Sequence, residues 1–164
     1  MLIDVLSAFL LGAVICDLAS HRLPNYYLLG GLLIGLALQV WLLGWFGLGL
    51  GGKGVLAGFA LFIPFYALGG MAAGDVKLMA AIGGFLDAES ALWAAACSLM
   101  IGGVLGIVYL IVKGDLGKLL VRYWAMVLTR SRIPAAEGEA ALHRFPYAVA
   151  IAAGTLLSLY WTPI

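Results

Sequence analysis

The sequence predicts an all-α, polytopic membrane protein with about six transmembrane helices. Of its 164 residues, 65% are hydrophobic and only 10% are charged, whereas a soluble globular domain has roughly 45–50% apolar and about 25% charged residues. Long unbroken apolar runs, such as 30–43 and 91–112, are typical of membrane helices and not of the short alternating strands of a barrel. At about 20 residues per crossing, we expect residues 1–164 to form one small integral-membrane domain.

Charged residues, prolines and polar clusters divide the chain into six expected spans. The first apolar run lacks the positive start and the small-residue cleavage site of a secretory signal, so we expect it to remain as a span. The third starts after Lys53. The fourth is short, because the cluster 87–90 is the only polar interruption within 76–112, and a re-entrant segment is the alternative there. In order, the expected spans are about 2–18, 26–45, 54–71, 76–86, 90–112 and 145–161.

The basic residues indicate how these spans are oriented. With six spans, eight of the nine Lys and Arg residues fall on one side, and Lys53 lies alone on the other. The positive-inside rule then places 19–25, 72–77 and 113–144 in the cytoplasm and both termini outside. The first half of 113–144 has basic and aromatic residues among Leu, Val and Met, which predicts a cytoplasmic interfacial helix on anionic membrane lipid.

The charge and the cysteine content bear on nucleic-acid binding, zinc binding and disulfide formation. A formal net charge of +1 gives no indication of a nucleic-acid partner. The two cysteines, Cys16 and Cys97, lie inside apolar runs and are not a CxxC pair, so neither a zinc site nor a disulfide framework is indicated. We expect both to be small buried hydrophobic residues.

Two aspartates lie at the ends of expected spans. Asp17 ends the first span, and Asp75 follows the small residues that end the third. Ionisable groups inside membrane spans cost roughly 2.5–3.5 kcal/mol at the bilayer centre on insertion scales, so such residues indicate function. Because two spans separate the pair, the inner ends of the first and third spans lie at the same membrane face, where the carboxyl groups can meet.

Two adjacent carboxyl groups can catalyse the hydrolysis of a peptide bond. They cannot both ionise easily, so one holds a proton while the other stays charged. The pair thus supplies a base that activates water and an acid that protonates the leaving amine, with the two roles unassigned. Glycines before Asp75, including Gly74, would let the backbone leave helical geometry and a peptide lie close. We therefore expect Asp17 and Asp75 to be catalytic, with no metal and no cofactor; the alternative is a pair of solvated aspartates at helix ends.

Three segments of the chain carry a known pattern. The first, 17–25, is an Asp followed by a short polar loop and the Pro-Asn that opens the next span. The second, 74–83, reads Gly-Asp-Val-Lys-Leu-Met-Ala-Ala-Ile-Gly, and the third, 144–154, begins Arg-Phe-Pro-Tyr at the start of the last span. In these segments the chain resembles the type IV prepilin peptidases, membrane aspartic proteases of the GxGD type, and most closely their short Tad/Flp-pilus branch. The first glycine of the family motif is replaced by Ala72 here, which is small enough for activity to be expected.

The resemblance implies a membrane endopeptidase with Asp17 and Asp75 as its catalytic pair. Its substrate would be a prepilin, whose short basic leader is removed beside its hydrophobic helix, at the cytoplasmic face of the bacterial inner membrane. Larger relatives also methylate the new N-terminus and carry an additional cytoplasmic domain with paired cysteines. This chain has neither that length nor those cysteines, so methyltransferase activity is not expected.

Other residues are expected to shape the site or to lie near the substrate. Lys77 would tune Asp75 or contact substrate. The alternative is that Lys77 only anchors the cytoplasmic end of its helix, as the positive-inside rule describes. The remaining residues are expected to shape the starts of helices or to allow close approach: Gly74, Pro24, Asn25, Pro146 and Tyr147.

Two other functional classes remain as alternatives. A small proton-coupled transporter would have polar residues along several spans, because membrane carboxylates also build proton relays. A pilus-assembly membrane subunit without catalysis would tolerate replacement of both aspartates by asparagine.

Overall fold

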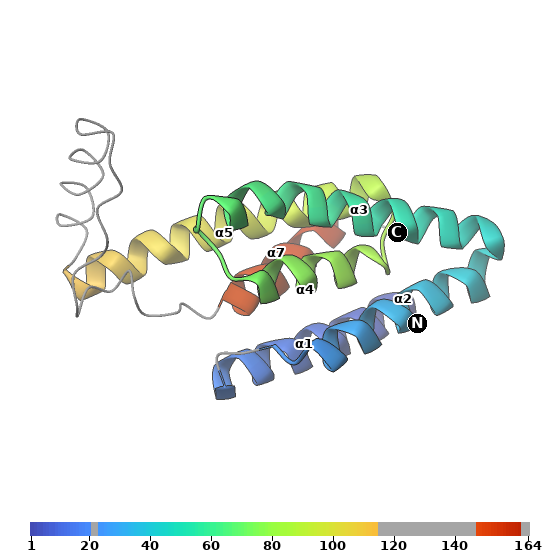
Figure 1. Cartoon of the computed structure of the whole chain (residues 1–164), viewed down its shortest axis with the longest axis horizontal. Helices are drawn as coiled ribbons and strands as arrows, with labels where there is room; N and C mark the ends of the chain where they lie inside the picture. The colour runs from blue at the N-terminus through green and yellow to red at the C-terminus, as the bar shows by residue number, and fades with distance from the viewer. Residues whose placement is uncertain (21–22, 115–146, 162–164) are drawn as a thin grey trace. The chain divides into compact units, whose positions relative to one another are not determined.

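The computed structural model describes residues 1–20, 23–114 and 147–161 of the chain, and within these ranges all regular structure is helical, with no strand. This confirms the predicted all-α fold. The helices, shown in Figure 1, are α1 (Leu2–Ser20), α2 (Asn25–Leu43), α3 (Trp45–Ala67), α4 (Ala73–Gly83), α5 (Ala88–Lys113) and α7 (Tyr147–Trp161).

Four of the described helices have the length and apolar composition to cross a membrane: α1, α2, α3 and the part of α5 up to Tyr109. By contrast, α4 has 11 residues and α7 has 15, fewer than the roughly 20 that a crossing needs. The predicted short fourth helix is therefore present. That this helix spans the membrane, with a re-entrant segment as the alternative, stays a prediction.

The third helix starts earlier than its sequence predicts. α2 and α3 are joined only at Gly44, whose φ of 63° is in the left-handed region that favours glycine. α3 therefore begins at Trp45 and not near residue 54, so Lys53 is an exposed residue within the helix and not part of a loop. Helix propensity disfavours the glycines of 47–54, but several of them allow close packing, which outweighs that preference.

The turn between α2 and α3 carries exposed aromatic side chains. Trp41, Trp45 and Phe46 are 82%, 84% and 72% exposed. Trp residues are enriched at the interfaces between membrane and water, where their amphipathic rings sit at the level of the headgroups. This end of the helical bundle thus has the composition of a membrane interface.

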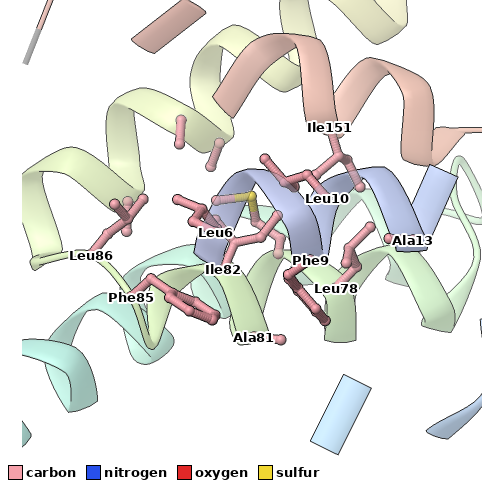
Figure 2. Packing of buried hydrophobic residues seen from close by; sticks show 14 of the residues in the cluster. Leu6, Phe9, Leu10, Ala13, Leu78, Ala81, Ile82, Phe85, Leu86 and Ile151 are labelled. Atoms are coloured by element: carbon pink, nitrogen blue, oxygen red, sulfur yellow. The ribbon is translucent and has the colours of Figure 1, made fainter. Parts of the chain in front are cut away.

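The short helix α4 forms the centre of the core. It contacts α2, α3 and α7, and its side chains Leu78, Met79 and Ile82 are fully buried. Figure 2 shows Leu6 and Leu10 of α1 in the same cluster as Leu78 and Ile82 of α4 and Ile151 of α7. A helix too short to cross the membrane is therefore covered by its neighbours on several sides.

Glycines allow the backbones of α3 and α4 to approach closely. A Cβ atom added to Gly54 would overlap the carbonyl oxygens of Gly83 and Leu86, and one added to Gly83 would overlap the carbonyl of Gly54. Small residues at such crossings are the usual way in which membrane helices pack, since lipid provides no hydrophobic driving force between them. This packing fixes α4, and with it Asp75, against α3.

The chain divides into two compact units, Met1–Gly102 with Pro146–Ile164, and Gly103–Phe145. The described part of the second unit is the end of α5, where apolar side chains such as Val104 and Ile107 are exposed, followed by Gly114 with a φ of 73°. The predicted interfacial helix within 113–144 lies outside the described residues beyond position 114. Pro146 also lies outside them.

Candidate active site

Asp17 lies near the end of α1 and is held by the start of α7. The residue is 8% exposed, and its Oδ2 accepts a hydrogen bond of 3.1 Å from the backbone N–H of Ala148. The first N–H groups of a helix have no acceptor within the helix, and the helix dipole favours an anion at this end. The buried carboxylate of Asp17 thus satisfies a donor that the first turn of α7 cannot satisfy itself.

Asp75 lies in the first turn of α4. It is 7% exposed, and its Oδ2 accepts a hydrogen bond of 3.1 Å from the backbone N–H of Ala72. This is half of a capping box. Ala72 has no side-chain oxygen for the other half, and the N–H of Asp75 instead donates to the Ala72 backbone carbonyl at 3.1 Å. The bond orients the Asp75 side chain toward the helix start.

Ala72 lies at the position where the resemblance led us to expect a glycine. Ala72 precedes α4 with φ −83° and ψ 153°, an extended conformation that any residue adopts. The expectation that glycines before Asp75 let the backbone leave helical geometry holds at Gly69 and Gly70 but is wrong at Gly74, which is the second residue of α4. A Cβ on Gly74 would make only an ordinary contact with Leu23, at 3.7 Å. The left-handed conformation occurs earlier, at Gly69, with a φ of 80°.

The first two residues of α7 connect the two aspartates. Ala148 donates its N–H to Asp17, and the Tyr147 hydroxyl lies within electrostatic reach of the Asp75 carboxylate. Consistent with this, α7 contacts both α1 and α4. Two carboxylates that are 58 positions apart in the sequence therefore lie around the same helix start.

Tyr147 is fixed by contacts with two further helices. Its ring makes an edge-to-face contact with Phe62 of α3, with ring centroids 6.4 Å apart. Its hydroxyl donates a long hydrogen bond of 3.5 Å to the carbonyl of Ser98 in α5. These contacts hold the start of α7, and hence the Ala148 N–H, in one place.

The structure brings two other expected residues together. The Lys77 ammonium donates a hydrogen bond of 2.9 Å to Oδ1 of Asn25, so the starts of α2 and α4 are linked at an exposed position. Pro24 precedes α2, and its carbonyl accepts the N–H groups of Tyr27 and Leu28 at 3.1 and 3.2 Å. Lys77 therefore bonds to α2, and this bond is distinct from any effect on Asp75.

Two acidic residues away from the Asp17 and Asp75 pair have local structural partners. Asp4 forms an ion pair of 2.7 Å with the N-terminal amino group. Asp87 Oδ1 accepts the N–H of Ser90 at 2.9 Å at the start of α5. Among the described residues, no three His, Cys, Asp or Glu side chains gather where they could hold a metal ion.

Sequence reasoning missed two features of this region. The first is the N–H of Ala148. It is a backbone group, and an alanine side chain does not indicate that its N–H binds a carboxylate. Gln39 was also missed: it is 4% exposed in α2, and its Nε2 donates to the Phe85 carbonyl at 2.9 Å. This bond satisfies a carbonyl in the turn after α4, so it has a structural role.

Comparison with known proteins gives one positive finding. The sequence model of the type IV leader peptidase family matches residues 5–111, more than half of the chain. A comparison with curated proteins found no match, and a comparison with solved structures found none either. The matched range contains both Asp17 and Asp75.

Proposed function

The chain belongs to the type IV leader peptidase family, and on this premise we propose that it removes the short N-terminal leader from prepilin-like precursors by means of Asp17 and Asp75. The observation that carries the proposal is the position of these two buried carboxylates around the start of α7. Buried carboxylates at the ends of apolar helices are costly, so their convergence supports a chemical role.

The proposed reaction is a direct hydrolysis. One aspartate, in its charged form, takes a proton from a water molecule, and the oxygen of that water attacks the scissile carbonyl carbon. The other aspartate, in its protonated form, gives its proton to the leaving nitrogen as the C–N bond breaks. Each carboxylate accepts a backbone N–H through its Oδ2, which orients the side chain for this chemistry.

The placement of the pair supports a precursor with a hydrophobic helix as the substrate. Asp17 and Asp75 lie at the ends of apolar helices, so a precursor with a hydrophobic helix in the bilayer would present its leader junction at that level. We propose that this level is the cytoplasmic face of the bacterial inner membrane, with both termini of the enzyme outside. We expect no methylation of the new N-terminus, which the mass of the cleaved product would show.

Co-expression with a candidate prepilin tests the proposal. Asp17→Asn and Asp75→Asn keep the size and the acceptor oxygen of each side chain but remove the carboxylate. Each should lower cleavage of the leader by roughly 10²- to 10⁴-fold, the range for loss of a general acid or base. Asp87→Asn is the matched control, because Asp87 also accepts a backbone N–H at a helix start, and it should cleave at the parent rate. Unreduced cleavage by either of the first two variants would remove the paired mechanism.

A further inference from the structure

A groove lies between α2 and α4 on the surface of the helical bundle. Its volume is about 330 Å³, which is within the range of small-molecule sites. Apolar side chains form most of it, and two polar residues lie together at one end; the lining is Asn25, Leu28, Leu29, Leu32, Phe59, Lys77, Ala80 and Ala81. The groove is thus apolar along its length and polar at one end only.

The polar end is a cationic group of hydrogen-bond donors. Lys77 donates to Oδ1 of Asn25 at 2.9 Å, which leaves the amide NH₂ of Asn25 and two further N–H bonds of the ammonium available. Asn25 is neutral, and within the described ranges Lys77 forms no ion pair. This end therefore suits one anionic group, and the apolar lining suits a hydrocarbon chain attached to it.

The groove opens on a face with exposed apolar and aromatic side chains. Tyr26 and Leu29 are 80% and 56% exposed, and Phe59 is 40% exposed. At about 100° per residue around a helix, Asp75 and Lys77 point about 200° apart, so the groove and the Asp75 carboxylate lie on opposite sides of α4. An occupant of the groove would therefore lie on the side of α4 away from the Asp75 carboxylate.

We propose that the groove between α2 and α4 binds one anionic phospholipid, with an acyl chain along Leu29, Leu32 and Ala80 and the headgroup phosphate on Lys77 and Asn25. Basic pockets between membrane helices bind anionic headgroups in this way. The lipid would hold the start of α4 to the start of α2. This inference concerns lipid binding alone and does not depend on the peptidase activity.

Native mass spectrometry of the purified full-length protein tests the proposal. The protein in detergent is titrated with phosphatidylglycerol or with phosphatidylcholine of the same acyl chains. We expect one lipid to be retained, with phosphatidylglycerol preferred. Lys77→Gln should weaken phosphatidylglycerol binding about fivefold, the effect of one basic residue near an anionic surface, and should weaken phosphatidylcholine binding less, because the choline group offsets the charge of its phosphate. Glycerol phosphate, which has no acyl chain, should not bind measurably.

Matched variants separate this site from general effects. Leu29→Trp fills the groove and should weaken binding of both lipids. Ile34→Trp adds the same ring to a half-exposed position on the far side of α2 and should change neither. Lys53→Gln removes an exposed charge outside the groove and should keep the lipid preference.

Three results would overturn the proposal. One is an unchanged lipid preference in Lys77→Gln, or an equal loss in Lys53→Gln. Another is binding of glycerol phosphate as tight as that of the lipid. The third is a Leu29→Trp variant that retains lipid like the parent but cleaves a prepilin more slowly, since the groove would then be a site for the hydrophobic part of the peptide.

Discussion

The contact between α3 and α4 gives a prediction whose magnitude follows from the structure. In Gly54→Ala, the new methyl group would overlap the carbonyl oxygens of Gly83 and Leu86, and backbone atoms cannot rotate away as side chains do. Overpacking of this kind costs about 1–3 kcal/mol. Replacing glycine by alanine in a helix is by itself favourable by about 0.5–1 kcal/mol.

The control lies two residues earlier on the same helix. Gly52→Ala meets nothing within 4 Å, so it should gain the favourable part alone. The two variants share that part, and the difference between their free energies of unfolding therefore isolates the overlap, about 1–3 kcal/mol. Unfolding in mild detergent by heat or by sodium dodecyl sulfate measures the difference.

Gly54→Ala should also slow cleavage of the leader. Because α4 carries Asp75, a shift of α4 away from α3 would move this carboxylate, and a displacement of about 1 Å can cost roughly 10²-fold in rate. The double variant Gly54→Ala with Gly83→Ala should cost less than the sum of the single ones, because both methyl groups push apart the same backbone contact. Equal stability of Gly54→Ala and Gly52→Ala would refute the close packing of these helices.

Two further predictions concern α7. Ala148→Pro removes the N–H that binds Asp17 but keeps the helix, because proline is tolerated in a first turn. Leader cleavage should fall about 10- to 100-fold, because a hydrogen bond to a charged group is worth about 1.5–3 kcal/mol. Val149→Pro is its control in the same turn, and an equal fall in that variant would show that the helix start and not the bond matters. Thr155→Val should raise the free energy of unfolding by about 1 kcal/mol, because within the described part of the chain the buried Thr155 hydroxyl has no hydrogen-bond partner. A lower free energy of unfolding in the same assay would indicate that the hydroxyl forms a hydrogen bond in the folded protein.

Much of the fold could be predicted because membrane helices are strongly constrained. Long apolar runs must be helical in lipid, so α1, α2 and α5 were expected close to their observed ranges. The start of α2 was predicted to within one residue, since proline favours a helix start and Pro24 precedes Asn25. The cluster 87–90 correctly separated α4 from α5.

The start of α3 could not be predicted in the same way. Charged residues set the boundaries of the expected spans, so Lys53 placed the start of the third span near residue 54, and the glycines of 47–54, which have low helix propensity, gave no sign of a helix there. Their helical conformation depends on contacts with α2 and α4, as at Gly47 and Gly54, where a Cβ would overlap the backbones of Gln39 and Gly83. Such contacts join segments that are distant in the sequence, which local patterns do not reveal.

The candidate site was partly accessible from the sequence. The cost of carboxylates in apolar segments identified Asp17 and Asp75, and the order of the spans indicated that they lie at one face. The bond between Lys77 and Asn25 and the role of the Ala148 N–H depend on the angle of each helix and on backbone positions. Sequence patterns alone contain neither.

The central claim is that the carboxyl groups of Asp17 and Asp75 meet at the start of α7. It is tested most directly by thiol cross-linking of a chain in which Cys16 and Cys97 are first replaced by alanine. Asp17→Cys with Asp75→Cys, treated in membranes with a short bifunctional thiol reagent, should give an intramolecular cross-link visible in the mass of the intact protein. Asp4→Cys with Asp75→Cys should give none, since Asp4 lies about 20 Å along α1 from Asp17 at about 1.5 Å per residue. The absence of a cross-link in the first pair, with both thiols reactive toward a monofunctional reagent, would contradict the account.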